Sequence, residues 1–141
     1  MFILIVGCGR VGSAIAKQLL DQGHEVSVLD RDALSHERLS RDQTLSWEDA
    51  GGTFTVGTAM EREALEQAGI ERADVLLAAS SGDNTNVVVA QIAKRLYNIP
   101  KVVVRIADPA RAAWYAEQGL QTICPTQVAI DMIEEAVLSE D

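Results

Sequence analysis

The stretch Ile3-Leu4-Ile5-Val6-Gly7-Cys8-Gly9-Arg10-Val11-Gly12 decides the fold of this 141-residue chain. Its apolar run leads directly into G-x-G-x-x-G, an amphipathic helical pattern follows, and a second apolar strand ends on Asp30. This order of strand, glycine loop, helix and later acid is typical of a dinucleotide-binding βαβ unit. Gly7 permits the tight turn, Gly9 lets the backbone approach a pyrophosphate, and Gly12 lets the helix pack close to the strand. We therefore expect phosphates at the N-terminus of that helix.

Strand and helix patterns alternate along the rest of the chain. Apolar runs predict strands at Phe2–Val6, Val26–Leu29, Thr53–Val56, Asp74–Ala79, Val102–Ile106 and Gln121–Cys124. Amphipathic stretches predict helices at Arg10–Gln22, Ala33–Gln43, Met60–Ala68, Asn84–Tyr97, Pro109–Gln118 and Gln127–Leu138, with a loop at Thr44–Gly52. Six strands interleaved with helices predict an α/β fold with a doubly wound, parallel, six-stranded Rossmann-type sheet. Residues 1–141 are expected to form one domain.

Composition and charge narrow the function classes. The formal net charge is −9, and a negative field repels nucleic acid, so no nucleic-acid partner is expected. No apolar run reaches the ~18 residues of a membrane span, and the N-terminus lacks a signal-peptide pattern, so a cytoplasmic protein is expected. Cys8 and Cys124 fit reduced cytosolic thiols. Cys8, inside the glycine loop, is either a small filler or a redox-sensing thiol at a helix N-terminus.

Several motifs, each weak alone, occur together along the chain. They are Gly7–Gly12 with Arg10 inside it, Val28–Asp32, Ala64–Ile70, Ala73-Asp74, Gly82–Asn86, Lys101–Pro109 and Thr126. In this order and spacing the chain resembles the N-terminal domain of RCK proteins (regulator of potassium conductance, also called KTN or TrkA-N). In particular, it looks like the TrkA-type cytoplasmic regulatory subunits of bacterial potassium uptake systems. The resemblance covers nearly the whole chain.

The resemblance implies a cytoplasmic regulatory domain, peripheral to the inner face of the cell membrane. Such a domain would bind an adenine nucleotide (NAD or NADH, or ATP, ADP or AMP) and gate a membrane potassium transporter or channel. It would assemble as a homodimer or a larger RCK ring, or with a second RCK protein. No counterpart of the small C-terminal domain common in the family is recognised in residues 1–141.

Two segments depart from the family pattern. Gly57-Thr58-Ala59 stands where the family usually has Gly-Asp-Ala. Thr58 and Ala59 therefore lie at the expected adenosine end without the usual carboxylate. The segment Gln43–Gly52 is longer than usual.

Asp30 is the first candidate binding residue. A carboxylate at the end of the second strand accepts hydrogen bonds from ribose hydroxyls and repels a 2′-phosphate, so NADP is disfavoured. Arg31 weakens that exclusion, because a guanidinium can pair with a phosphate. The alternative for Asp30 is to cap a helix or turn.

Arg10 and Val11 follow Gly9 in the glycine loop. The resemblance implies that Arg10 reaches the terminal phosphates of the ligand, often across a dimer, and a guanidinium suits bidentate phosphate contacts. The alternative for Arg10 is a solvated side chain near a helix start.

Further candidates lie where the fourth and fifth strands end. Ala79, Ser80 and Asn84 surround the predicted switch point of the sheet, where ligands bind in open α/β folds. Asn84 would bond a ribose or phosphate, or cap its helix. Arg105 needs a partner in so apolar a strand, either a phosphate or an acid such as Asp108.

No catalytic residue set and no cluster of metal ligands is recognisable in the sequence. Two functions therefore compete: a regulatory nucleotide-binding module, and the cofactor-binding domain of an NAD-dependent oxidoreductase. The second needs additional residues to hold a substrate and donate a proton, and none remain after the sixth strand. The regulatory, non-enzymatic interpretation is favoured.

The last helix, at about residues 126–138 with Thr126 as its N-cap, is predicted to dimerise. Its apolar residues lie near two faces by helical spacing: Val128, Met132 and Ala136 on one, and Ile130, Ile133 and Val137 on the other. One face is expected to pack on the chain's own sheet. The other would be exposed in a monomer, which predicts a two-fold symmetric dimer.

Overall fold

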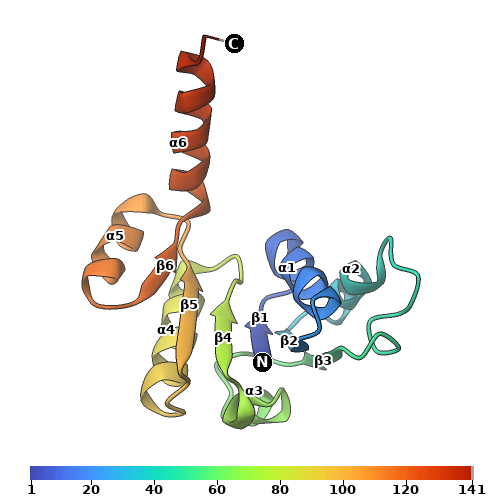
Figure 1. Ribbon diagram of the computed structural model, residues 1–141. Coiled ribbons are helices and arrows are strands. Elements are labelled where there is room, and N and C mark those ends of the chain that lie inside the picture. The colour runs from blue at the N-terminus through green and yellow to red at the C-terminus, as the bar shows by residue number, and fades with distance from the viewer. Residues whose placement is uncertain (141) are drawn as a thin grey trace.

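The computed structural model describes residues 1–140 and contains a six-stranded sheet (Figure 1). The strands are β1 (Phe2–Val6), β2 (Glu25–Asp30), β3 (Thr53–Val56), β4 (Val75–Ala78), β5 (Lys101–Arg105) and β6 (Gln121–Ile123). Their order is β3-β2-β1-β4-β5-β6, and every neighbouring pair is parallel. The predicted doubly wound α/β fold is confirmed. Because the direction of winding reverses between β1 and β4, a ligand crevice is expected at their carboxyl ends.

The helices follow the predicted order, with one clear difference. They are α1 (Arg10–Asp21), α2 (Glu37–Ser40), α3 (Arg62–Gln67), α4 (Asp83–Arg95), α5 (Pro109–Glu117) and α6 (Pro125–Leu138). The helix predicted at Ala33–Gln43 is instead a 3-10 turn, Ala33–His36, followed by the short α2. Arg41 has extended backbone and Asp42 has a φ of 61°. Neither conformation can continue a right-handed helix.

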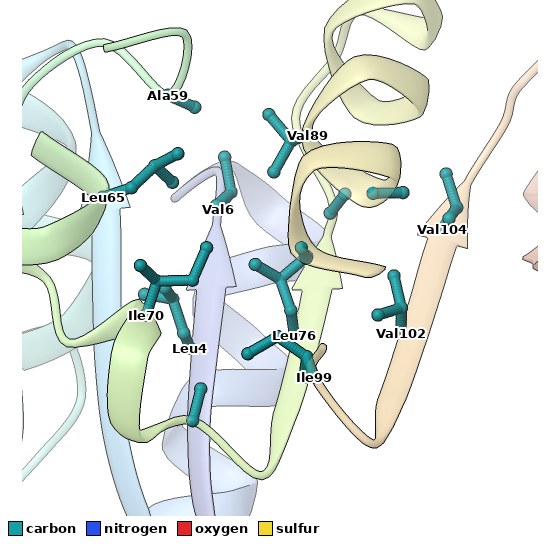
Figure 2. Close-up of a cluster of buried hydrophobic side chains, with 14 of the residues drawn as sticks. Leu4, Val6, Ala59, Leu65, Ile70, Leu76, Val89, Ile99, Val102 and Val104 are labelled. Carbon is teal, nitrogen blue, oxygen red and sulfur yellow. The ribbon is translucent and has the colours of Figure 1, made fainter. Parts of the chain in front are cut away.

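Apolar side chains pack on both faces of the sheet, as a continuous apolar strand such as β1 requires. Phe2, Leu4 and Val6 point into one cluster, which helices α3, α4 and α5 cover. Figure 2 shows part of this cluster. Ile3 and Ile5 point into the other, beneath α1 and α2. The alternating directions along β1 place the glycine loop at the carboxyl end of a fully buried strand.

The long segment between α2 and β3 folds back onto the second cluster. Trp47 is 1% exposed, and its indole Nε1 donates to the carbonyl oxygen of Thr53 at 2.9 Å. A Cβ on Gly52 would collide with the Trp47 ring. Trp47 therefore packs into the second cluster, from a segment that is longer than usual in the family pattern.

Helix α6 differs most from the prediction. None of its residues is buried, and Figure 1 shows it, in red, projecting away from the sheet. The expectation that one face packs on the chain's own sheet is wrong. The helix continues along the direction in which β6 ends, so it leaves the sheet without turning back over it. Both apolar faces are exposed in the single chain.

The N-cap of α6 is also not the predicted residue. Cys124 precedes the helix with extended backbone, and its Sγ accepts a hydrogen bond from the Gln127 backbone N–H at 3.4 Å. Thr126 lies inside the helix because Pro125 already occupies its first position. Proline suits that position, since its φ is preset and it has no N–H to leave unpaired.

Candidate functional site

A cleft of about 610 Å³ opens at the carboxyl ends of the strands, across the switch point. Eleven of the thirteen predicted residues line it: Gly7, Gly9, Arg10, Val11, Asp30, Arg31, Thr58, Ala59, Ala79, Ser80 and Arg105. Gly12 and Asn84 do not. These residues lie at or just after the ends of five strands, which the parallel sheet brings to one edge.

The glycine loop has the geometry that its sequence predicts. Gly7 has a φ of 110°, and a Cβ there would lie 2.6 Å from the backbone nitrogen of Ser80. A Cβ on Gly12 would collide with the carbonyl oxygen of Gly7, so Gly12 lies behind the loop and permits the close packing of α1. Gly9 has no atom within 4 Å of a Cβ and faces the open cleft. Gly7 therefore permits the turn, Gly12 permits the close packing of α1, and Gly9 leaves room for a ligand to approach the backbone.

The carboxylate of Asp30 holds the glycine loop in place. Its Oδ2 accepts from the backbone N–H of Cys8 at 2.6 Å, and its Oδ1 accepts from that of Asp32 at 2.8 Å. The capping alternative is thus realised. Because a carboxylate can accept about four hydrogen bonds, Asp30 also keeps capacity for a ligand in the cleft that it lines.

The replacement Asp30→Ala is expected to weaken ADP binding ten- to a hundredfold, since a set of charge-assisted hydrogen bonds is worth about 1.5–3 kcal/mol. Calorimetry on the purified chain measures the change. Asp30→Asn keeps one oxygen for the Cys8 N–H but removes the charge. Its ADP affinity should therefore lie between those of Asp30→Ala and the wild type. An ADP affinity that is unchanged in Asp30→Ala would exclude Asp30 from the ligand site.

Arg38 is a site residue that the sequence did not reveal. Its Nη1 donates to the carbonyl oxygen of Cys8 at 3.1 Å, and its side chain lines the cleft. The Cys8 peptide group is therefore held on both sides, by Asp30 at its N–H and by Arg38 at its carbonyl. No motif includes Arg38, because it reaches the loop only through the way α2 packs.

Burial is the largest effect on the pKa of the Cys8 thiol and raises it, the hydrogen bond with Ser35 lowers it by less, and the nearby Asp30 charge raises it. Cys8 is fully buried, and its Sγ donates to the carbonyl oxygen of Ser35 at 3.3 Å. A raised pKa keeps the thiol protonated at neutral pH, whereas a redox sensor needs an accessible thiolate. These observations favour the filler interpretation of Cys8.

Arg105 lies at the end of β5 with part of its guanidinium unpaired. Its Nη1 donates to the carbonyl oxygen of Ser80 at 3.3 Å, while its Nε is buried without a hydrogen-bond partner. Within residues 1–140 it forms no ion pair with Asp108, which instead caps α5 by accepting from the Ala110 N–H. Of the two partners expected for Arg105, a phosphate or an acidic side chain, the acidic side chain does not pair with it in the described residues. Arg105 also lines the cleft, where its guanidinium charge suits an anion.

Asn84 does not line the cleft and does not cap its helix. Its Oδ1 accepts from Nη2 of Arg111 at 2.6 Å, and Gly82 is the N-cap of α4. The helix begins at Asp83, so Asn84 lies within its first turn. Asn86, two residues later, is fully buried and contacts the cleft-lining residues Ser80 and Arg105.

The cleft carries positive charge within an acidic chain. Arg10, Arg31, Arg38 and Arg105 line it, against the two carboxylates of Asp30 and Asp32. Those carboxylates already accept backbone hydrogen bonds. The formal balance of the lining is thus positive although the chain carries −9 overall. Clefts that concentrate one sign of charge attract ligands of the opposite sign.

Neither a metal centre nor a membrane span is found in residues 1–140. No group of three or more His, Cys, Asp or Glu side chains in these residues could hold a metal ion. No helix there is long and apolar enough to cross a membrane.

Comparison with known proteins gives consistent matches. The family model of the TrkA-N domain matches residues 3–126. The chain is 39% identical over 138 residues to the Trk system potassium uptake protein TrkA of Streptomyces coelicolor, covering 98% of this chain and 59% of that protein. The chain thus spans about three fifths of the length of this curated relative.

Solved structures share the fold. The Kef C-terminal domain of Shewanella denitrificans in its AMP-bound form has a TM-score of 0.77 at 24% identity, covering 100% of this chain and 83% of that one. The GsuK channel bound to NAD has a TM-score of 0.75 at 21% identity, covering 95% of this chain and 22% of that one.

Proposed function

Because the chain belongs to the TrkA-N domain family, we propose that it is the nucleotide-sensing part of a regulatory subunit. It binds an adenine nucleotide in the cleft between the glycine loop, Asp30 and Arg105. Binding changes the geometry of an assembly that gates a membrane potassium transporter or channel from the cytoplasmic side. The chain is not an enzyme in this proposal: the ligand acts by differential affinity for two arrangements.

The observation that carries the proposal is one positively charged cleft built on a glycine loop. The loop leaves open space at Gly9, and the buried Nε of Arg105 lacks an acceptor. A ligand whose phosphates lie near the glycine loop and whose ribose lies near Asp30 would match the cleft at both places. AMP and NAD, which are bound in the two similar structures, share an adenosine 5′-phosphate of this shape.

A thermal-shift series tests this function. AMP, ADP, ATP and NADH should each raise the melting temperature, since a ligand that binds only the folded state stabilises it by RT ln(1 + [L]/Kd). NADPH should raise it less, because its 2′-phosphate meets the Asp30 carboxylate. If no adenine nucleotide raises it at millimolar concentration, the proposal fails. Strict preference for NAD(H) together with turnover of a hydroxy acid would favour the oxidoreductase alternative.

Arg10 is expected to sense the terminal phosphates. It is exposed at the mouth of the cleft, so Arg10→Ala should weaken ATP binding about tenfold, corresponding to about 1.4 kcal/mol, and AMP binding less than about twofold. Calorimetry with both nucleotides measures the difference.

Arg95→Ala is the matched control for Arg10→Ala. It removes the same charge from an exposed position outside the cleft and should leave both affinities unchanged. Equal losses of ATP and AMP binding in Arg10→Ala would instead indicate that Arg10 supports the loop, which removes its sensing role.

A further inference from the structure

Asn86 lies beneath the cleft without lining it, and all of its hydrogen-bonding capacity is used there. Its Oδ1 accepts from the backbone N–H of Ser80 at 2.9 Å and from the Ser80 hydroxyl at 2.6 Å. Its Nδ2 donates to the carbonyl oxygens of Ser80 and Arg105, both at 2.9 Å. A side-chain amide has two donor hydrogens and one acceptor oxygen with two lone pairs, so no group is left unpaired.

These four bonds hold the two cleft residues whose positions matter for an anion. The Ser80 backbone lies directly under the glycine loop, where even a Cβ on Gly7 would come within 2.6 Å of it. The Ser80 carbonyl also receives Nη1 of Arg105 at 3.3 Å. Asn86 therefore holds Arg105 twice: at its own carbonyl, and at its guanidinium through Ser80.

The geometry points to Asn86 as a positioning residue for the phosphate end of the cleft. It fixes the Ser80 peptide and the Arg105 guanidinium in the arrangement that receives the ligand's phosphates, before any ligand is bound. This inference rests on the proposed nucleotide-binding function. Preorganisation of this kind raises affinity because the protein groups are ordered before the ligand binds. The gain applies only to the part of the ligand that these groups touch.

The chemistry of this position restricts the choice of residue. An aliphatic side chain of similar size would remove the acceptor of the Ser80 N–H and one hydrogen-bond donor from each of the carbonyl oxygens of Ser80 and Arg105. An aspartate would keep the acceptor for Ser80 but lose both donors. Asn84, on the same helix, contacts Arg111 instead and lies outside the cleft, which makes it a matched control.

The test compares ADP with adenosine, which lacks phosphate, by calorimetry. Asn86→Ala should weaken ADP binding at least about tenfold and adenosine binding less than about twofold, because Asn86 acts only on the phosphate end. Asn84→Ala should leave both unchanged. In an Arg105→Ala background, Asn86→Ala should cost markedly less ADP affinity, since the two residues act through one contact. Equal losses for ADP and adenosine, or no loss, would overturn the inference.

A measurement on the wild-type chain covers the case in which Asn86→Ala does not fold. In nitrogen–proton correlation spectra, ADP should shift the side-chain amide resonances of Asn86, whereas adenosine should leave them in place. Unshifted resonances with bound ADP would overturn the inference alone. A wild-type chain that binds neither ADP nor adenosine would instead refute the proposed function.

Discussion

A chain that carries both Met132→Asp and Ile133→Asp is expected to be monomeric at micromolar concentration, whereas the wild type is expected to be a two-fold symmetric dimer. The two side chains are 65% and 63% exposed in the single chain. Burying each in a dimer contributes about 1.5–3 kcal/mol per copy. Replacing both with carboxylates should therefore raise the dissociation constant at least about a thousandfold, or about 4 kcal/mol. Light scattering over a concentration series measures this.

The physical reason lies in the shape and setting of α6. At about 100° per residue, its apolar side chains Val128, Ala129, Ile130, Met132, Ile133, Ala136 and Val137 form one arc of about 200°. A single packing surface needs an arc of only about 100°. A lone helix of this length is also marginal in water. Such a helix is expected to lie in a groove that a second chain helps to form.

The sheet offers a surface that this helix could cover. On the face opposite the α4 side, Val75, Leu77 and Val103 are only half-buried, and Ile123 is 49% exposed. Among the described residues, α1 packs on β1 and β2, whereas α4 and α5 pack on the other face of β4, β5 and β6. We therefore expect α6 of one copy to pack against this face of the other.

A charge-matched variant separates dimerisation from simple charge repulsion. Gln127→Glu with Leu138→Glu adds two carboxylates on the polar arc of α6 and should remain dimeric. The melting of the remaining domain should stay cooperative in both variants, because α6 contributes no buried residue to the core. A wild type that is monomeric at micromolar concentration would refute the assembly.

Gly12→Ala is expected to destabilise the fold by about 3 kcal/mol, lowering the melting temperature by roughly 10 °C and abolishing nucleotide binding. The added Cβ would collide with the carbonyl oxygen of Gly7. That atom is backbone inside the glycine loop, so it cannot move aside without displacing the loop. Thermal unfolding followed by circular dichroism measures the loss of stability.

Gly9→Ala is the matched variant, and it should weaken nucleotide binding while leaving stability nearly unchanged. No atom lies within 4 Å of the added Cβ, so stability should fall by less than about 1 kcal/mol, the cost of alanine at an N-cap. The methyl group would stand where the backbone approaches a pyrophosphate, so ADP affinity should fall at least about a hundredfold. A Gly9→Ala chain that binds ADP as the wild type does would show that the phosphates lie elsewhere.

The strands and the glycine loop could be predicted because their signals are local. A buried parallel strand reads as a continuous apolar run, and a glycine loop reads as glycines at fixed spacing. The same signals placed most candidate residues at the carboxyl edge of the sheet. The alternative of a cap at Asp30 also followed from residue chemistry, and the structure contains these hydrogen bonds.

The differences between expectation and structure depend on direction rather than on residue type. Asn84 and Asn86 are chemically identical, but about 200° of helical rotation separates them, so the point at which α4 begins decides which one contacts the cleft residues Ser80 and Arg105. Cys124 caps α6 in place of Thr126 because Pro125 takes the first helical position. A boundary shift of one or two residues lies within the uncertainty of reading a helix from its pattern.

By itself, the sequence determined the order of the elements, the parallel sheet and the edge at which a ligand would sit, because each follows from periodicity along the chain. Only the tertiary structure decided which side chains meet there. Arg38 reaches Cys8 from 30 positions away, Asn86 joins Ser80 to Arg105, and α6 finds no surface on its own sheet. Contacts between distant segments depend on packing angles and helix phase, which no local pattern encodes.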